Sequence, residues 1–517
     1  MTLNDLIYLL PELILLLAAT VVFALDALWP REKTKGWLPY VALAGLVAAA
    51  AGLLPALIKG GQGGVVASML AADPFAVFFK LLAILAVAVV ILTAMPYLTG
   101  RTPYRGEFYA LLLIVAAAIC LATSATNLVM IYLGMEFLSI TSYILAGYLR
   151  NDKKSGEAAL KYFLYGAIAS AVMLYGMSLL YGATGTTDLA GIAAAFREQV
   201  GAGLVVPVSN AATSARPAPT LGVPALILLL AGFGFKASLA PFHQWAPDTY
   251  EGAPTPVTAF LSTASKAAGF AILMRVFLVA LAPMQSEWVA LLIAVSVLTM
   301  TVGNLTALRQ INVKRLLAYS SIAQAGYMLI GVAAVAGAGL LAPVSGAAAS
   351  ARPAPTFNGI NGVLIYLFAY LFTNVGAFAV VTAVETATGK VELKDYAGLI
   401  RRSPWLAGLL LLFLLSLAGI PPTGGFLGKF YVFGAAVQRQ MWGLLAIAAV
   451  NSVMAAFYYL NVVRYMFFTP AEADAAPIRV AWPLRVSLGI TAVLTLLLGL
   501  APGPLITWAA QSVRLLR

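Results

Sequence analysis

The sequence predicts an all-α polytopic membrane protein with about fourteen transmembrane helices. Of its 517 residues, 62% are hydrophobic and only 10% are charged, and the mean hydropathy is +0.95. A soluble domain of this size would need more polar surface to cover its core. Apolar runs of about 20 residues, the length that crosses a bilayer as a helix, recur along the whole chain. Lys and Arg gather in alternate connections between these runs, as expected of a chain that crosses a membrane repeatedly.

The apolar runs define the predicted spans in order. The first run carries Asp5 and Glu12 and has no basic segment before it, so we expect a spanning helix rather than a cleaved signal. The twelfth is long because Gly419-Ile-Pro-Pro-Thr-Gly-Gly425 interrupts it. The spans are expected near 4–26, 37–58, 74–98, 107–124, 126–149, 156–182, 222–243, 254–281, 286–306, 314–336, 359–387, 404–438, 441–468 and 483–512.

A broken helix that contains a lysine is predicted twice, near 222–243 and near 404–438. Five spans separate the two, and an odd offset inserts the second unit upside down relative to the first. Inverted repeats with interrupted helices in matching positions are typical of transporters. We therefore expect three N-terminal helices in 1–106, a first antiporter-like repeat of five helices in 107–281, a second inverted repeat of five in 282–468, and a last helix in 469–517.

The connections indicate how the chain is oriented. Odd-numbered connections are rich in cations, for example Arg150, Lys153 and Lys154, whereas even-numbered connections hold few. The positive-inside rule places the odd connections in the cytoplasm and both termini on the opposite side. Two even connections, about 183–221 and 337–358, resemble linkers and share the heptapeptide Ser-Ala-Arg-Pro-Ala-Pro-Thr at 214–220 and 350–356. It is either a partner-binding motif or a low-complexity insertion, and its Pro/Ala composition favours the insertion.

Composition also excludes several classes of function. The formal charge is +12, but the cations form no basic block and no nucleic-acid motif, so we expect no nucleic-acid partner. The chain has one cysteine, Cys120, and one histidine, His243. An iron–sulfur cluster needs about four ligands, so this chain alone cannot hold one. A bis-histidine haem and a disulfide within the chain are excluded in the same way.

Three lysines, Lys236, Lys266 and Lys429, lie well inside apolar runs. A charge at the centre of a bilayer costs about 2.5–3.5 kcal/mol on insertion scales, and such residues usually mark an ion or proton path. A lysine in apolar surroundings can exchange a proton near neutral pH. The alternative is snorkelling of the charge toward the interface. Lys80 and Arg275 fit snorkelling better, because they lie nearer the ends of their spans.

Other ionisable residues are also candidates for proton transfer. Glu136, in the middle of its span, is either a proton-binding acid paired with a lysine or half of a structural ion pair. Lys161 is intermediate, about one turn inside its helix and near Glu157. His243 follows a helix break close to Asp248, and a proton shuttle and a packed histidine are equally compatible with that position.

Polar residues in the tenth and eleventh spans have two interpretations. Ser320, Gln324 and Tyr327 share one helical face, which either holds a water chain or joins helices together. Asn374 and Glu385 in the eleventh span are similar cases with less support.

Several motifs resemble one known family. The stretch Leu239-Ala-Pro-Phe-His-Gln-Trp-Ala-Pro-Asp-Thr-Tyr-Glu-Gly-Ala-Pro-Thr-Pro-Val-Thr-Ala-Phe260, followed by Lys266, closely resembles the antiporter-like membrane subunits of respiratory complex I, NADH-quinone oxidoreductase. Within these it is most similar to the subunit N group. Leu133-Gly-Met-Glu136, Ala159-Leu-Lys-Tyr-Phe163, Ala318-Tyr-Ser-Ser-Ile322 and Pro421-Pro-Thr-Gly-Gly-Phe-Leu-Gly-Lys429 agree, and the similarity covers roughly residues 1–500.

The resemblance implies a proton-translocating subunit of a redox-driven translocase that has no redox centre of its own. FMN, the iron–sulfur clusters and quinone would belong to other subunits, and the partners would be other membrane-arm subunits in a bacterial cytoplasmic membrane. It implies a proton relay through Glu136, Lys161, Lys236, Lys266 and Lys429, to which the helix break adds His243 as a candidate. In such a relay, a change of charge at one site alters the cost of protonating the next by Coulomb coupling.

Two other functions remain open from sequence. A stand-alone cation/proton antiporter subunit would share the fold and many of the motifs. A structural membrane scaffold with vestigial charges is the third, and the presence of Glu136 together with all three deep lysines argues against it.

Overall fold

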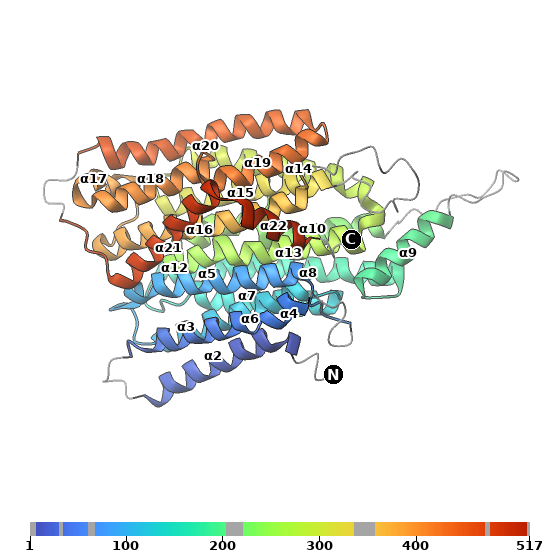
Figure 1. Cartoon of the computed structure of the whole chain (residues 1–517), viewed down its shortest axis with the longest axis horizontal. Helices are drawn as coiled ribbons and strands as arrows, with labels where there is room; N and C mark the ends of the chain where they lie inside the picture. Colours follow the sequence, from blue (N-terminus) through green and yellow to red (C-terminus); the bar gives the residue numbers. More distant parts are fainter. Residues whose placement is uncertain are drawn as a thin grey trace, which may run out of the picture.

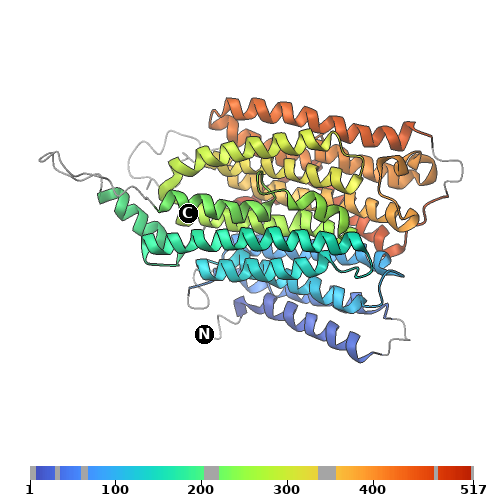
Figure 2. The same ribbon diagram turned by 180° about the vertical axis from the view of Figure 1, so that it is seen from behind.

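The computed structural model describes residues 7–29, 35–59, 68–202, 221–335, 357–470 and 476–513, and nearly every element in them is a helix. The helices lie side by side as one slab, with α2 (Leu10–Leu28) and α3 (Leu38–Ala51) along one edge and α20 (Trp442–Phe468) along the other (Figure 1). Figure 2 shows the same order from behind, with α8 (Lys153–Thr184) running across the face of the slab. The heptapeptides at 214–220 and 350–356 lie outside the described residues.

Most predicted spans correspond to one continuous helix. Within the described ranges, twelve helices are long and apolar enough to cross a membrane, and two shorter apolar helices accompany them. This arrangement is compatible with the predicted fourteen spans. The remaining continuous helices are α5 (Pro74–Leu98), α6 (Arg105–Ser124), α7 (Leu128–Ala146), α14 (Gln285–Ala307), α15 (Val313–Val335) and α16 (Gly359–Thr388).

Several predicted boundaries differ from the structure. The second span, 37–58, is α3 followed by the short α4 (Leu54–Lys59). The last, 483–512, is α21 (Trp482–Leu500) and α22 (Gly503–Ser512), because the Pro502–Gly503 step interrupts the helix. The segment 183–221, expected to be a linker, begins with α9 (Leu189–Ala202), which extends beyond one end of the slab (Figure 1). Its buried apolar residues, such as Ile192 and Phe196, pack against the end of the eighth span.

Two predicted spans are interrupted in the structure. The seventh, expected to end at 243, extends further and consists of α10 (Gly222–Ala237) and, beyond the break, α11 (Trp245–Gly252); the twelfth consists of α18 (Pro404–Ala418) and α19 (Gly424–Gln438). Prolines remove backbone donors in both breaks, at Pro241 and at Pro421-Pro422. The eighth span is continuous but irregular: α12 (Thr255–Phe260), the π-helical turn η1 (Leu261–Ser265), α13 (Lys266–Arg275) and a second π-helical turn, η2 (Val276–Ala280).

The interior of the slab is built around α15 and α16. Both are 94% buried over their most apolar stretch, whereas α8 at the surface is only 28% buried. α16 packs against α5, α12, α15, α18, α19 and α21. The polar side chains that α15 and α16 carry are therefore enclosed by protein, where each needs a hydrogen-bonding partner.

Candidate proton-relay site

The first broken helix places Lys236 in the last turn of α10, where it is 1% exposed. Ser238 ends the helix in a left-handed conformation, with φ of 57°, and its N–H bonds to the carbonyl of Phe235. The same carbonyl accepts a 3.0 Å bond from Nε1 of Trp245, which joins α11 to α10 across the break. Lys236 is thus held at the carbonyl end of a half-helix, the end that favours a positive charge.

Lys236 contacts α7 rather than a carboxylate. Its Nζ donates to Oγ of Ser139 at 3.0 Å and lies 5.9 Å from the centre of the Tyr162 ring. Glu136, one turn before Ser139 on the same helix, is half-buried and accepts a hydrogen bond from Ser170. Glu136 and Lys236 therefore interact electrostatically without forming the direct ion pair that was expected.

Lys266 follows the π-helical turn η1 and is 1% exposed. Its Nζ donates to the backbone oxygen of Ser321 on α15 at 2.6 Å and also to the hydroxyl of the same serine. One turn beyond Lys266, Gly269 lets α13 approach α10, since a Cβ there would lie 3.3 Å from Cβ of Lys236. The packing of two helices thus brings the first two buried lysines to the same region of the slab.

The lysine of the second broken helix contacts the other half of its own helix. Lys429 belongs to α19, but its Nζ reaches back across the break to the last carbonyls of α18, at 3.2 Å from Leu417 and 2.9 Å from Ala418. These carbonyls have no partner inside their own helix, so the ammonium group caps the negative end of α18. The ring of Tyr327 lies 4.7 Å away and adds a cation–π contact.

A hydrogen-bonded network connects the surroundings of Lys266 with those of Lys429. Ser320, next to the serine that binds Lys266, shares a hydrogen bond with Tyr459 of α20. Gln324 donates to the Tyr459 hydroxyl at 3.2 Å and to the Leu417 carbonyl at 2.8 Å, the carbonyl that also accepts from Lys429. Ser320 and Gln324 therefore join helices directly, as one of the two sequence interpretations proposed, and polar side chains line a route from the neighbourhood of Lys266 to Lys429.

Buried hydroxyls without partners lie between Lys236 and Lys266. The hydroxyls of Tyr162, Ser238 and Tyr250 have no hydrogen-bond partner in the described part of the chain. An unsatisfied buried group costs about 1–3 kcal/mol, and native proteins satisfy such groups with ordered water. This region is therefore suited to holding water between the two lysines.

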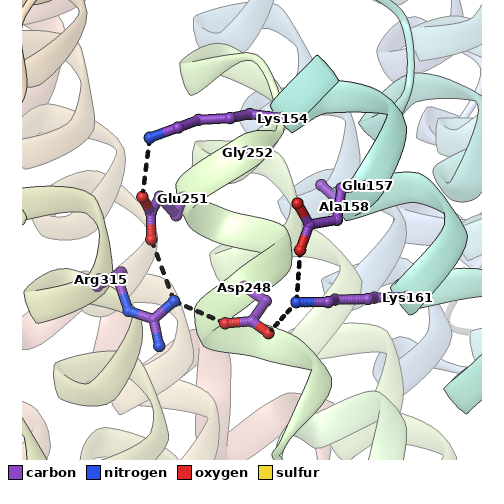
Figure 3. Close-up of a pocket in the computed structure, with 8 residues that line it drawn as sticks. All are labelled: Lys154, Glu157, Ala158, Lys161, Asp248, Glu251, Gly252 and Arg315. Carbon is purple, nitrogen blue, oxygen red and sulfur yellow. Dashed lines mark hydrogen bonds and ion pairs between the residues drawn. The ribbon is translucent and has the colours of Figure 1, made fainter. Parts of the chain in front are cut away.

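Lys161 lies in a separate cluster, which we call the charge cluster: Lys154, Glu157, Lys161, Asp248, Glu251 and Arg315 (Figure 3). Lys161 pairs with Glu157 at 2.7 Å and with Asp248 at 2.8 Å, and Arg315 bridges Asp248 and Glu251 at 2.6 and 3.1 Å. The cluster surrounds a cavity of about 140 Å³ that is open to the surface. It ties α11 to α8 and α15, so the half-helix after the first break is held from both sides.

His243 lies within the first break and is half-buried, and its Nδ1 has no hydrogen-bond partner among the described residues. Neither the buried lysines nor the charge cluster bonds to it through any described contact.

The snorkelling prediction for Lys80 and Arg275 was wrong. Lys80 is 4% exposed and pairs with the buried Glu12 at 2.6 Å, and Arg275 is 3% exposed and makes two bonds to Asp73, at 2.7 and 2.8 Å. Both cations pair with buried carboxylates from distant parts of the sequence. The position of a residue within its own span does not reveal such partners. Sequence analysis also missed Lys314, which is 3% exposed and donates to the Ala253 carbonyl at 2.8 Å.

The buried cations therefore fall into two groups. Lys80 and Arg275 have carboxylate partners. Lys236, Lys266, Lys314 and Lys429 have no carboxylate within 4.0 Å among the described residues and contact hydroxyl and carbonyl oxygens instead. A paired buried charge is typical of a structural role, whereas a buried cation without a counter-ion is costly and typical of a functional site.

Comparison with known proteins identifies the family to which the chain belongs. Residues 125–343 and 346–455 match the family model described as NADH:quinone oxidoreductase/Mrp antiporter, TM. The chain is 41% identical over 511 residues to NADH-quinone oxidoreductase subunit N of Trichlorobacter lovleyi, covering 98% of this chain and 96% of that one. It is 42% identical over 494 residues to subunit N of Moorella thermoacetica, with 95% and 94% covered.

Solved structures share the fold. A chain of respiratory complex I from Thermus thermophilus, determined with bound aureothin, superimposes with a TM-score of 0.74 at 34% identity, covering 96% of this chain and 98% of that one. A chain of the Mrp complex from a Dietzia species has a TM-score of 0.81 at 22% identity, with 100% and 98% covered, which shows a common fold only. The chain therefore belongs to the NADH:quinone oxidoreductase/Mrp antiporter membrane family and, within it, to the subunit N group of NADH-quinone oxidoreductases.

Proposed function

We propose that this chain translocates protons in the membrane arm of an NADH-quinone oxidoreductase, through a relay of Glu136, Lys236, Lys266 and Lys429. The observation that carries the proposal is the absence of a carboxylate partner at the three buried lysines, within the part of the chain that the structure describes. Because each ammonium is solvated only by neutral oxygens, its protonation is sensitive to the charge of its neighbours.

The contacts suggest an order for the relay. Glu136 lies one turn from Ser139, the residue that Lys236 contacts, so its charge acts on Lys236. Lys236 and Lys266 belong to helices that pack closely where Gly269 of α13 approaches α10. From Lys266 the polar route continues through α15 and Gln324 to Lys429. In this relay, release of a proton by one lysine lowers the cost of protonating the next. Lys161, in the charge cluster, and His243, in the break, would act upstream, near the mouth of the first half-helix.

The chain's organisation and setting are part of the proposal. The two repeats would occupy 107–281 and 282–468 in opposite orientations, with helices 1–106 and 469–517 flanking them, and the odd-numbered connections would face the cytoplasm. FMN, the iron–sulfur clusters and quinone would be bound by other subunits, because this chain offers one cysteine and one histidine. The electron-transfer step would then drive the relay only through the neighbouring membrane-arm subunits. A stand-alone antiporter is less well supported, since the relatives that share about 40% identity are named as NADH-quinone oxidoreductase subunits.

The test is proton pumping by the intact complex in proteoliposomes. Lys236→Ala, Lys266→Ala and Lys429→Ala should each lower the number of protons moved per NADH oxidised, because each removes one site of the relay. Lys153→Ala, at an exposed position, is the matched control and should leave this ratio unchanged. Native electrophoresis would verify that each variant assembles. Full pumping by assembled complexes carrying the three relay substitutions would refute the proposal.

A further inference from the structure

Glu385 forms a second polar site near the end of α16, on the same side of the slab as the charge cluster. Its carboxylate accepts a 3.0 Å bond from the Tyr97 hydroxyl and a hydrogen bond from Thr255, the first residue of α12. Arg101 approaches only to 3.7 Å and is itself 27% exposed at its side chain, so it is a weak ion-pair partner. The best contacts of Glu385 are therefore neutral hydroxyls, unlike those of Asp73, which binds Arg275 twice.

Glu385 lies at the boundary between solvent and protein interior. Its side chain is 14% exposed, whereas Tyr97 is 3% exposed and Thr255 is fully buried. The carboxylate can thus exchange protons with water on one side and contact a buried hydroxyl on the other. Nothing in the proton relay described above uses this residue.

A stripe of polar side chains leads from Glu385 to Lys266. Thr255, Thr258 and Ser262 are spaced by three and four residues, so they share one face of the eighth span, and Lys266 follows Ser262 one turn later, directly after the π-helical turn η1. All four are at most 1% exposed. The distance along the helix from Thr255 to Lys266 is about 16 Å, at 1.5 Å per residue. The stripe therefore crosses a large part of the apolar interior and ends at a proposed relay site.

The facing helix supplies matching polar groups. α16 packs against α12 and η1, and Asn374 of α16 donates from Nδ2 to the Ser262 hydroxyl at 2.7 Å. The other amide atom of Asn374, Oδ1, has no hydrogen-bond partner in the described part of the chain, and neither do the hydroxyls of Tyr250 and Tyr370. Buried polar groups are normally satisfied by protein or by ordered water, so this row of groups is suited to holding water along the stripe.

We propose that Glu385 is a proton-loading carboxylate that supplies Lys266 through this stripe. The inference rests on the proposed function, because it requires Lys266 to gain and lose a proton. In the step, the protonated carboxyl group releases its proton through water held along the stripe and becomes a carboxylate, and the neutral amine of Lys266 becomes an ammonium group. Glu385 then takes a new proton from water at its exposed side, and no electron moves.

Charged and polar groups from several neighbouring elements surround Glu385 and determine its electrostatic environment. Lys314 of α15 is buried and near enough for its charge to interact with the carboxylate. Such cations attract a deprotonated carboxylate and keep it at the mouth of the stripe. The groups that face Glu385 are Tyr97 of α5, Arg101 just after α5, Thr255 of α12, Lys314 of α15 and Tyr396 of η4 (Leu393–Tyr396).

The experiment compares variants of the intact complex in proteoliposomes, measuring protons moved per NADH oxidised. We expect Glu385→Gln to cause at least half of the loss that Lys266→Ala causes, and Glu385→Asp to restore most of it because a carboxylate is present again. Ser262→Ala, which removes a stripe hydroxyl without changing charge, should lower the ratio in the same direction. The controls are Glu287→Gln, an exposed carboxylate at the other end of the slab, and Ser487→Ala, a buried hydroxyl away from the stripe; neither should lower the ratio.

The outcomes separate this inference from the proposed function. A normal ratio in Glu385→Gln together with a lowered ratio in Lys266→Ala would overturn the inference and leave the relay intact. A normal ratio in Lys266→Ala would overturn both. If Glu385→Gln fails to assemble, Ser262→Ala decides: a normal ratio in that variant rejects the stripe, and a lowered ratio that the Ser487→Ala control does not share supports it.

Discussion

Replacing Asp73 by Asn should destabilise the fold strongly without changing its shape. Asp73 is 6% exposed and binds Nη1 and Nη2 of Arg275 at 2.7 and 2.8 Å, while Arg275 Nε donates to the Thr123 carbonyl at 3.0 Å. Asp73 also caps α5 by accepting from the Ala76 N–H at 2.7 Å. Asn has nearly the same volume and can still accept that cap bond, so the substitution isolates the loss of charge.

The size of the loss in unfolding free energy follows from the burial of both Asp73 and Arg275. Removing one partner of a buried ion pair typically costs about 3–5 kcal/mol, because the remaining charge is left uncompensated. That free energy corresponds to a change of about two to four orders of magnitude in the ratio of folded to unfolded chain. Asp73→Asn with Arg275→Met should recover most of the loss, since no isolated charge then remains.

The effect of pH on this pair has a defined sign. Burial raises the pKa of the Asp73 carboxyl, but the charge and hydrogen bonds of Arg275 outweigh it and hold the pKa below its usual range. A depressed pKa means that the stabilisation is present above the pKa of the unfolded chain, about 3.9, and is lost only as pH falls through the folded value. The loss caused by Asp73→Asn should therefore be constant between about pH 5 and pH 8.

The assay is the fraction of purified complex that retains this chain after heating, measured for the single and double variants at several pH values. Glu107→Gln is the control, because the Glu107–Arg150 pair is exposed and 4.0 Å long and should contribute no more than about 1 kcal/mol. A single variant that is no less stable than the double variant would refute the reasoning.

Three further predictions concern packing and the polar route. Gly425→Ala should prevent assembly or pumping, because the added Cβ would overlap the backbone of Ser416, whereas Gly443→Ala, with nothing within 4 Å, should be tolerated; native electrophoresis checks both. Gln324→Leu should lower the protons moved per NADH, since it removes a donor to the α18 terminus on the route to the last lysine. Asp248→Asn should loosen α11 by about 1 kcal/mol, seen as roughly fivefold faster amide exchange at 245–252; unchanged exchange would show that the charge cluster does not hold this half-helix.

Hydropathy predicted most of the architecture because a bilayer constrains helix length so strongly. The spans at 74–98 and 359–387 match α5 and α16 to within a residue. Pro241 and Pro421-Pro422 located both breaks, since proline cannot supply a helix donor. The helix at Leu189–Ala202 was missed because its 14 residues are too few to span a membrane, which was the criterion used to find helices.

The candidate site was predicted less completely than the fold. Lys236, Lys266 and Lys429 were recognised as deep because depth can be counted along one run of sequence. The counter-ion of a buried cation cannot be identified in that way, because whether Lys80 pairs with Glu12 depends on how the first and third predicted spans pack. The polar route through Tyr459 and Gln324 likewise joins residues 135 positions apart. Depth is a local property of a sequence, and counter-ions are a property of the tertiary structure.

The direction in which Lys266 points depends on how many residues the π-helical turn η1 contains, and less on which residues they are. The turn holds Leu261–Ser265 immediately before the lysine. Deleting any one of these residues would rotate the helix beyond it by about 100°, turning Lys266 away from Ser321 while leaving its depth nearly unchanged. Outside Ser262, substitutions that preserve the length of this segment should therefore be tolerated where a single deletion is not. The length of one turn, and not only its chemistry, is then under functional constraint.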